Sequence, residues 1–184
     1  MSKPFKRLLI TGAAGRLGSV LRKHLAAFAD ELRLTDIADL GQAAPHEQLI
    51  RCDLGNFDDV LPLTEGVDAI VHAGGVPVED TFAKILNGNI VGTYNIYEAA
   101  RRNGVKRVVY TSSNHAIGFH DRTETIDATA AHRPDSLYGV SKCFAEDLGR
   151  YYWDKFGIES VNLRIGSSFP EPLDRRMLAT WLSF

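Results

Sequence analysis

The sequence predicts an α/β protein built on a doubly wound parallel sheet. Short apolar runs typical of buried strands alternate along the 184 residues with segments of helical periodicity. Several of these runs end in glycine or serine turns, and open parallel sheets bind ligands at the carboxyl ends of their strands. The composition fits one soluble globular domain, with 45% apolar residues, 24% charged residues and a net charge of -2.

Composition also limits the partners and the compartment. A slightly acidic chain lacks the basic surface that attracts nucleic acids and anionic membranes, so we expect neither partner. Two cysteines, Cys52 and Cys143, are too few for a disulfide framework. The first apolar run is too short for a signal peptide, and no run approaches a membrane span. We therefore expect a cytoplasmic protein. The histidines show no ligand spacing with cysteines or acids, so we predict no metal site.

The first predicted unit is a strand over Arg7–Thr11, a glycine turn and a helix. In this order, the glycines let the backbone approach a pyrophosphate, and the helix N-terminus offers free N–H groups. A glycine turn that binds nothing is the alternative. We predict cofactor contacts from five residues of the turn, namely Gly12, Gly15, Arg16, Leu17 and Gly18.

The second predicted strand, Leu32–Asp36, ends in a carboxylate eighteen residues after Gly18. An acid at this position suits the ribose hydroxyls of NAD and repels the 2′-phosphate of NADP. No arginine follows immediately to bind a phosphate, so the sequence favours NAD. A solvated turn aspartate is the alternative interpretation, and Asp39 is a nearby competitor for the same role.

Two further strands are predicted over 48–52 and 68–72. Asp53 and Leu54 follow the third strand, and Asp53 either caps the 56–63 helix or accepts a hydrogen bond from an adenine amino group. The fourth strand leads into a second turn of small residues, Ala73-Gly74-Gly75, at a ligand-binding strand end. His72 in that strand is more typical of a core histidine than of a catalyst.

A long helix is predicted over 81–102, followed by a fifth strand over 106–111. Gly88, Asn89 and Gly92 are unusual inside a helix and indicate close packing, with a polar side chain bound to backbone. Gly104 is expected to end this helix. The fifth strand leads into Ser112-Ser113-Asn114-His115, a third polar strand end.

The last predicted helix carries a phenol and an amine with the spacing of one helical turn. Ser136 is expected to cap this helix, which continues to about Phe156 and places Tyr138 and Lys142 on one face. An ammonium beside a phenol favours the phenolate, whose ordinary pKa is about 10. The preceding segment, 116–135, is irregular and is expected to lie on the substrate side. A sixth strand over 158–165 and a turn over 166–168 follow.

Three motifs together resemble those of the extended short-chain dehydrogenase/reductase family. They are T-G-x-x-G-x-x-G at 11–18, S-S at 112–113 and Y-x-x-x-K at 138–142. The resemblance implies a Rossmann fold, NAD(P) as cofactor and a catalytic set of Ser113, Tyr138 and Lys142. Cofactor contacts are implied for Tyr138 and Lys142, the latter on a ribose hydroxyl, and also for Asp36, Asp53, Leu54, Ala73, Gly74, Gly75, Asn89 and Ser112.

Dispersed blocks of sequence resemble, more narrowly, the bacterial uronate dehydrogenases within that family. The blocks are S-S-N-H from 112, L-Y-G-V-S-K-C-F from 137, D-K-F-G from 154, R-I-G-S from 164, P-E-P from 170, and R-M-L with T-W from 176 to 181. This likeness implies oxidation of the C1 hydroxyl of pyranose D-glucuronate or D-galacturonate to the aldarolactone, with NAD. The substrate would be a small uronic acid, and we expect a homo-oligomer.

The same resemblance implies a role for each catalytic residue. Tyr138 would remove the C1 hydroxyl proton as hydride leaves for the nicotinamide. Ser113 would hydrogen-bond that oxygen, and Lys142 would lower the pKa of Tyr138.

The likeness also implies the sugar contacts. Sugar hydroxyls would be bound by Ser113, Asn114, His115 and Ser167. Arg176 would pair with the uronate carboxylate, a role that suits the bidentate geometry of a guanidinium. Arg175 is the adjacent alternative, and a solvated helix face is the other interpretation of both arginines.

Two features limit how far the likeness extends. Pro77 stands where the family pattern predicts a serine, so one sugar contact is expected to be missing. We assign 1–165 to an NAD-binding domain and 166–184 to the start of a small substrate-side region. Because the chain ends in the apolar run Trp181–Phe184 and family members continue past this point, we expect that region to be incomplete and activity to be poor.

Two other functions fit part of the pattern. A nucleotide-sugar epimerase or dehydratase needs room for a nucleotide diphosphate, whereas Asn114 and His115 with Arg176 favour a small acidic sugar. A regulatory NAD-binding protein typically lacks the Tyr–Lys pair, which is present here.

Overall fold

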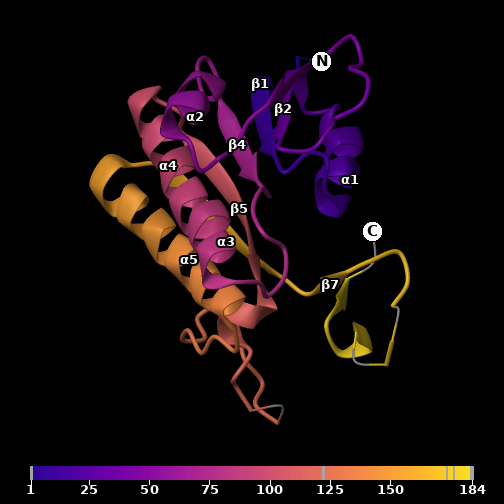
Figure 1. Ribbon diagram of the computed structural model, residues 1–184, viewed down its shortest axis with the longest axis vertical. Coiled ribbons are helices and arrows are strands. Elements are labelled where there is room, and N and C mark those ends of the chain that lie inside the picture. Colours follow the sequence, from indigo (N-terminus) through magenta and orange to yellow (C-terminus); the bar gives the residue numbers. More distant parts are fainter. Residues whose placement is uncertain (1, 122, 173, 176, 183–184) are drawn as a thin grey trace.

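A six-stranded parallel sheet with helices on both faces forms the body of the protein (Figure 1). The computed structural model describes residues 2–121, 123–172, 174–175 and 177–182. The strands of the sheet are β1 (Phe5–Thr11), β2 (Ala29–Asp36), β3 (Glu47–Arg51), β4 (Ala69–His72), β5 (Arg107–Ser113) and β6 (Glu159–Ile165). The helices are α1 (Arg16–Leu25), α2 (Phe57–Leu63), α3 (Phe82–Ile85), α4 (Gly92–Arg102) and α5 (Leu137–Phe156).

The strand order β3-β2-β1-β4-β5-β6 confirms the predicted doubly wound sheet. Every neighbouring pair within this sheet is parallel. The order reverses between β1 and β4, which is where a doubly wound sheet opens a crevice for a ligand. The turns after these two strands lie against each other, because a side chain at Gly12 would come within 2.6 Å of the Ala73 carbonyl oxygen.

Alternating side chains of the strands divide the core into two layers. Leu9 of β1 faces the layer that contains α2, α4 and α5, together with Ile70 and Val108. Leu8 and Ile10 face the opposite layer, where Leu21 of α1 packs. Figure 1 shows α1 on one side of the sheet and α2, α4 and α5 on the other.

One part of the sheet has apolar side chains in solvent. Val161 and Leu163 of β6 are each 45% exposed, and both point away from the face that α5 covers. Val161 is in register with Val109 of β5, which is half-buried. A small second sheet, β7 (Ser167–Ser168) with β8 (Trp181–Leu182), lies beyond β6 along the chain, after a short link.

The predicted 81–102 helix contains a wider turn. Six residues between α3 and α4, η1 (Leu86–Val91), form a π-helical turn. The cause is the packing predicted for Asn89 and its glycine neighbours, since Asn89 bonds to the backbone of Val76 and a side chain at Gly92 would press on Leu54. Gly104 follows α4 with a φ of 72°, as predicted.

The segment between β5 and α5 is irregular, as expected. It begins with a 3-10 turn, η2 (Asn114–Ile117), and it contains no strand or α-helix up to Ser136 in the part that the structure describes. The C-terminal segment contains the short 3-10 turn η3 (Met177–Ala179) and the β7–β8 pair. In the described residues, every helix is too short or too polar to cross a bilayer.

Candidate active site

The start of α5 is fixed by two side-chain caps. The Ser136 hydroxyl accepts a hydrogen bond from the Gly139 N–H at 2.9 Å, which confirms the predicted cap. The Glu79 carboxylate, from the segment after β4, accepts from the N–H groups of Tyr138 at 2.7 Å and Leu137 at 3.2 Å. These caps satisfy donors that a helix N-terminus otherwise leaves free, and they hold the backbone that carries Tyr138.

Lys142 lies one turn below Tyr138 and is buried. Its ammonium donates to the Thr111 carbonyl oxygen at 2.8 Å and sits 5.2 Å from the centre of the Tyr138 ring. Burial lowers the pKa of Lys142 to about 7, although the negative charge of Glu146 acts to raise it. A pKa near 7 is low for a lysine, whose ordinary pKa is about 10.4.

The pKa of Tyr138 is raised in this structure, whereas the sequence led us to expect that Lys142 lowers it. The reason is that the phenol is largely buried, and burial disfavours the phenolate. The nearby Ser113 hydroxyl acts in the opposite direction and lowers the pKa of Tyr138. The structure therefore brings the serine and tyrosine of the motif close together.

The two serines that end β5 have different partners on α5. Ser113 is directed to Tyr138, and its oxygen also accepts from the His115 N–H at 3.2 Å. Ser112 instead donates to the Glu146 carboxylate on α5 at 2.5 Å. The hydroxyl of Ser112, predicted to contact the cofactor, is therefore bound to another protein group.

Asn114 and His115 stand at the mouth of this cluster. The Ser113 hydroxyl donates to Asn114 Oδ1 at 3.2 Å. The His115 ring lies edge-on to Tyr138 with 5.6 Å between ring centres, and its Nδ1 is 2.8 Å from an oxygen of Asp135. A carboxylate at Nδ1 directs Nε2 away from it, so Asp135 sets the orientation of the ring.

The glycine turn after β1 leaves no room for side chains. Gly12 has a φ of 68°, in the region that favours glycine, and a side chain at Gly18 would overlap the carbonyl oxygen of Gly12. Gly15 is the N-cap residue of α1. As a glycine it has no side chain to accept hydrogen bonds from the first N–H groups of the helix. Leu17 belongs to the first turn of α1, and the guanidinium of Arg16 lies 4.1 Å from the centre of the Phe169 ring. This geometry fits a bound pyrophosphate.

Asp36 ends β2 beside the glycine turn. Its carboxylate accepts hydrogen bonds from the N–H groups of Ala14 and Ala38, each at 3.0 Å. The nearby Asp39 bonds to Gly41 instead, at 3.1 Å. Two backbone donors from different sides hold the Asp36 carboxylate in place at the rim of the turn.

The predicted adenine side of the site is a surface depression next to Asp36. It is lined by Ile37, Ile50, Arg51, Cys52, Asp53, Asp59 and Pro62. Asp53 does not cap α2, because that place is taken by Asn56, whose side chain accepts from the Asp58 N–H. Asp53 accepts from the Gly55 N–H at 2.9 Å, and Leu54 is buried against Gly74.

The second small-residue turn, Ala73–Gly75, is held from behind by Asn89. The Asn89 side chain accepts from the Val76 N–H at 2.7 Å, donates to the Val76 carbonyl at 3.1 Å and donates to Ser141 at 3.0 Å. These bonds use the side chain within the protein. We therefore revise its predicted role from cofactor ligand to support of the turn.

Ser167 lies apart from this cluster. Ser167 belongs to β7 and contacts the Thr180 hydroxyl at 2.9 Å. Arg176 lies outside the described residues, and its neighbour Arg175 is exposed. His72 is a core histidine, as predicted. Its two ring nitrogens contact Thr11 and Thr93, and burial lowers its pKa to about 3.

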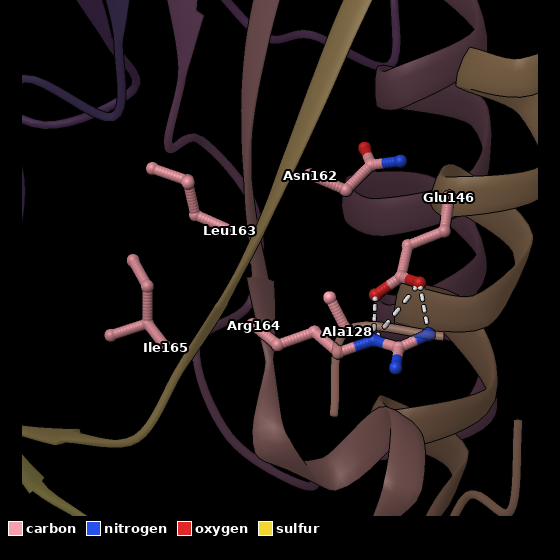
Figure 2. Close-up of a pocket in the computed structure, with 6 residues that line it drawn as sticks. All are labelled: Ala128, Glu146, Asn162, Leu163, Arg164 and Ile165. Carbon is pink, nitrogen blue, oxygen red and sulfur yellow. Dashed lines mark hydrogen bonds and ion pairs between the residues drawn. The ribbon is translucent and has the colours of Figure 1, made fainter. Parts of the chain in front are cut away.

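Sequence reasoning missed four polar side chains that support the site. Glu79 and Asp135 were not singled out, and only their contacts across the chain identify them. Glu146 from α5 and Arg164 from β6 face each other at a pocket (Figure 2). The spacing of Glu146, one turn after Lys142, was a signal available in the sequence.

A family model described as the NAD dependent epimerase/dehydratase family matches residues 8–182. Among curated proteins, uronate dehydrogenase of Pseudomonas putida is 57% identical over 182 residues, which are 98% of this chain and 68% of that protein. Uronate dehydrogenase of Agrobacterium fabrum is 53% identical over 97% of this chain and 67% of its own length. The chain thus spans about two thirds of the length of these relatives.

Solved structures of uronate dehydrogenases are also similar to this chain. Uronate dehydrogenase from Agrobacterium tumefaciens has a TM-score of 0.94 at 53% identity, covering 98% of this chain and 68% of that chain. A mutant of that enzyme complexed with NAD has a TM-score of 0.94 at 52% identity, covering 97% and 68%. A UDP-galactose 4-epimerase is more distant, with a TM-score of 0.80 at 26% identity over 90% and 59%.

Proposed function

The chain belongs to the NAD dependent epimerase/dehydratase family, and from that premise we propose that it oxidises a hexuronate with NAD. The substrate is D-glucuronate or D-galacturonate in its pyranose form, and the product is the aldarolactone. The observation that carries the proposal is the position of the buried Lys142 ammonium, 5.2 Å from the centre of the Tyr138 ring, with the Ser113 hydroxyl close to the phenol. The relatives at 53–58% identity, named uronate dehydrogenases, support the choice of substrate.

Each residue of the cluster has its own role in proton transfer. Tyr138 as phenolate takes the proton from the C1 hydroxyl, and Ser113 donates a hydrogen bond to the same oxygen. NAD, when bound, supplies the acceptor for the hydride that leaves C1. Lys142, as ammonium, stabilises the phenolate and holds a ribose hydroxyl. Because burial raises the pKa of Tyr138, a positive charge near the phenol is needed for it to act as a base.

The fit of NAD rests on the shape of the turns after β1, β2 and β4. Gly12 and Gly18 let the backbone of the turn pack closely against the turn after β4 and the start of α1, and the first turn of α1 offers its N–H groups to a pyrophosphate. The carboxylate of Asp36 suits ribose hydroxyls and repels a 2′-phosphate. The depression that Asp53 lines suits the adenine ring.

Substrate recognition is assigned to the residues at the mouth of the cluster. Asn114 and His115 bind sugar hydroxyls beside Tyr138. Ser167 and Arg176, from the C-terminal segment, bind a hydroxyl and the carboxylate respectively. In this proposal 1–165 binds NAD and 166–184 begins the substrate-binding region.

The proposal also covers the cellular compartment and the oligomeric state of the protein. We place it in the cytoplasm, which is consistent with two cysteines that are both free thiols. We also propose a homo-oligomer. Sedimentation of the purified protein at two concentrations tests this assignment.

The direct test is to add D-glucuronate, D-galacturonate and D-glucose separately, with NAD, and follow NADH absorbance. NADH is expected with at least one uronate and not with glucose, which lacks the carboxylate. Tyr138→Phe should abolish turnover while calorimetry still detects NAD binding. Equal rates with glucose, or no NADH with either uronate, would contradict the proposal. Interconversion of UDP-sugars without net NADH would instead assign the chain to the epimerases of its family.

A further inference from the structure

A buried carboxylate that the proposed mechanism does not use lies just below the catalytic pair. Glu146 follows Lys142 by one turn of α5 and Tyr138 by two turns, so all three share one helix face. It is buried, and its oxygens are bound on three sides. Ser112 donates from β5 at 2.5 Å, Arg164 from β6 at 2.8 Å, and His132 lies 3.0 Å away.

Consecutive turns of α5 hold the last residues of β5. Lys142 donates to the Thr111 carbonyl at 2.8 Å, and Glu146 accepts from the hydroxyl of the next residue, Ser112. The residue after that is Ser113, whose hydroxyl lies near Tyr138 and lowers its pKa. The position of the Ser113 hydroxyl therefore depends on both bonds between α5 and the strand.

Glu146 also places a negative charge in the buried region around Lys142. The groups that face Lys142 are His72 from β4, Tyr110 from β5 and Tyr138 on its own helix. Burial raises the pKa of both phenols and keeps His72 neutral, so none of the three balances the charge of the Lys142 ammonium. Glu146 is the acid whose charge raises the pKa of Lys142.

The surroundings of Glu146 keep it ionised. Burial acts to raise the pKa of Glu146, but hydrogen bonds from Arg164, Ser112 and His132 outweigh burial and lower it. Cys143 on α5 is a neutral thiol, because burial raises its pKa to about 11, and Asp147 faces solvent. Figure 2 shows the Arg164 guanidinium bound to both carboxylate oxygens.

We propose that Glu146 is a positioning residue for the proton transfer, holding the end of β5 in place and compensating the charge of Lys142. This inference rests on the proposed function, because it assigns Glu146 a part in the same site. Loss of its charge would let Lys142 lose its proton at lower pH, and Tyr138 would then lack the cation that its phenolate requires.

The first test follows the titration of Lys142 itself, without cofactor or substrate. NMR of protein labelled with 13C-lysine reports its midpoint, and Lys142→Arg assigns the signal. The wild-type midpoint is expected near the pKa of about 7. Glu146→Gln should lower it by about one pH unit, whereas Glu146→Asp, which keeps the charge, should move it back toward wild type. An unchanged midpoint in Glu146→Gln would overturn the inference.

The second test compares turnover with a uronate and NAD across pH. Glu146→Gln should lower kcat about tenfold with KM values changed less than about twofold, and its alkaline decline should begin about one pH unit lower. Ser112→Ala removes only the strand contact, so kcat should fall without a shift of the pH profile. Asp154→Asn, an exposed acid on the same helix, is the matched control and should change neither quantity.

These outcomes separate the inference from the proposed function. Absence of turnover in the wild-type protein contradicts the proposed function, while the NMR midpoint still tests Glu146. Wild-type turnover together with an unshifted pH profile in Glu146→Gln contradicts the inference alone. A loss of kcat that Glu146→Asp fails to restore, with the wild-type profile kept, would assign Glu146 to folding.

Discussion

The carboxylate of Asp36 is one residue whose position determines a chemical preference. Backbone N–H groups of Ala14 and Ala38 fix it at the rim of the glycine turn. A fixed negative charge there repels a 2′-phosphate but accepts hydrogen bonds from ribose hydroxyls. We predict that Asp36→Asn lowers the ratio of kcat/KM for NAD to that for NADP at least about tenfold, because the repulsion is lost.

The control for this prediction is Asp39→Asn. Asp39 accepts from Gly41 within its own turn and is exposed, so its removal should leave the cofactor ratio unchanged. A change of preference in Asp39→Asn, and none in Asp36→Asn, would show that the sequence interpretation chose the wrong acid. Steady-state rates with both cofactors at a fixed uronate concentration measure the ratio.

Residue-scale prediction succeeded where chemistry and spacing were local. Tyr138 and Lys142 lie close together on α5, as their spacing indicated, and Asn89 is bound to backbone as its place in a glycine-flanked helix suggested. The effect of burial was not predictable from spacing. The sequence does not show how deeply the site is buried from solvent, and this burial reverses the expected pKa shift of Tyr138.

The beginning of α5 links stability to activity at the scale of an element. Ser136 caps the helix, and Tyr138 lies in its first turn. We predict that Ser136→Ala costs about 1 kcal/mol of unfolding free energy and also lowers kcat, because a frayed first turn moves the phenol. Urea unfolding and initial rates with a uronate measure the two effects.

A cap far from the site provides the comparison. Asn56 caps α2 in the same way, accepting from the Asp58 N–H at 3.3 Å. Asn56→Ala should destabilise the protein by a similar amount while kcat stays at the wild-type value. If both variants lowered kcat equally, the loss would follow from general destabilisation and not from the place of Tyr138.

Most elements of the fold were predictable because their signals are local. The strand ends at Thr11, Asp36 and His72 agree with the apolar runs, and the cap of α5 agrees with Ser136. The π-helical turn over Leu86–Val91 was not predictable, because a contact with the segment after β4 causes it. Glu79 was missed for the same reason: its partners are 58 and 59 residues away.

At the scale of the whole molecule, the exposed side of β6 is the feature with the clearest consequence. Val161 and Leu163 lie on the face away from α5 and remain open to solvent. Apolar surface of this kind binds fluorescent dyes such as ANS. We predict that the native chain binds ANS and that Val161→Thr with Leu163→Thr reduces the fluorescence with little change in Tm.

Ile158 gives the matched control, since it lies just before β6 but is buried. Ile158→Thr should lower Tm and leave or increase ANS fluorescence, because it opens the core without removing the exposed side chains. Dye binding that survives in the double variant, in a protein with native circular dichroism, would contradict the prediction.

The different partners of Ser112 and Ser113 on α5 also restrict how this chain can be recombined with its relatives. A chimaera joined inside β5 keeps both serines in their places only if the splice leaves the number of strand residues unchanged. Loss of one residue there would bring the Ser113 hydroxyl to the place opposite Glu146, and gain of one residue would bring Ser112 to the place near Tyr138. Val105, in the short link before Arg107, is buried in the core, so a crossover point in this link must also keep its length.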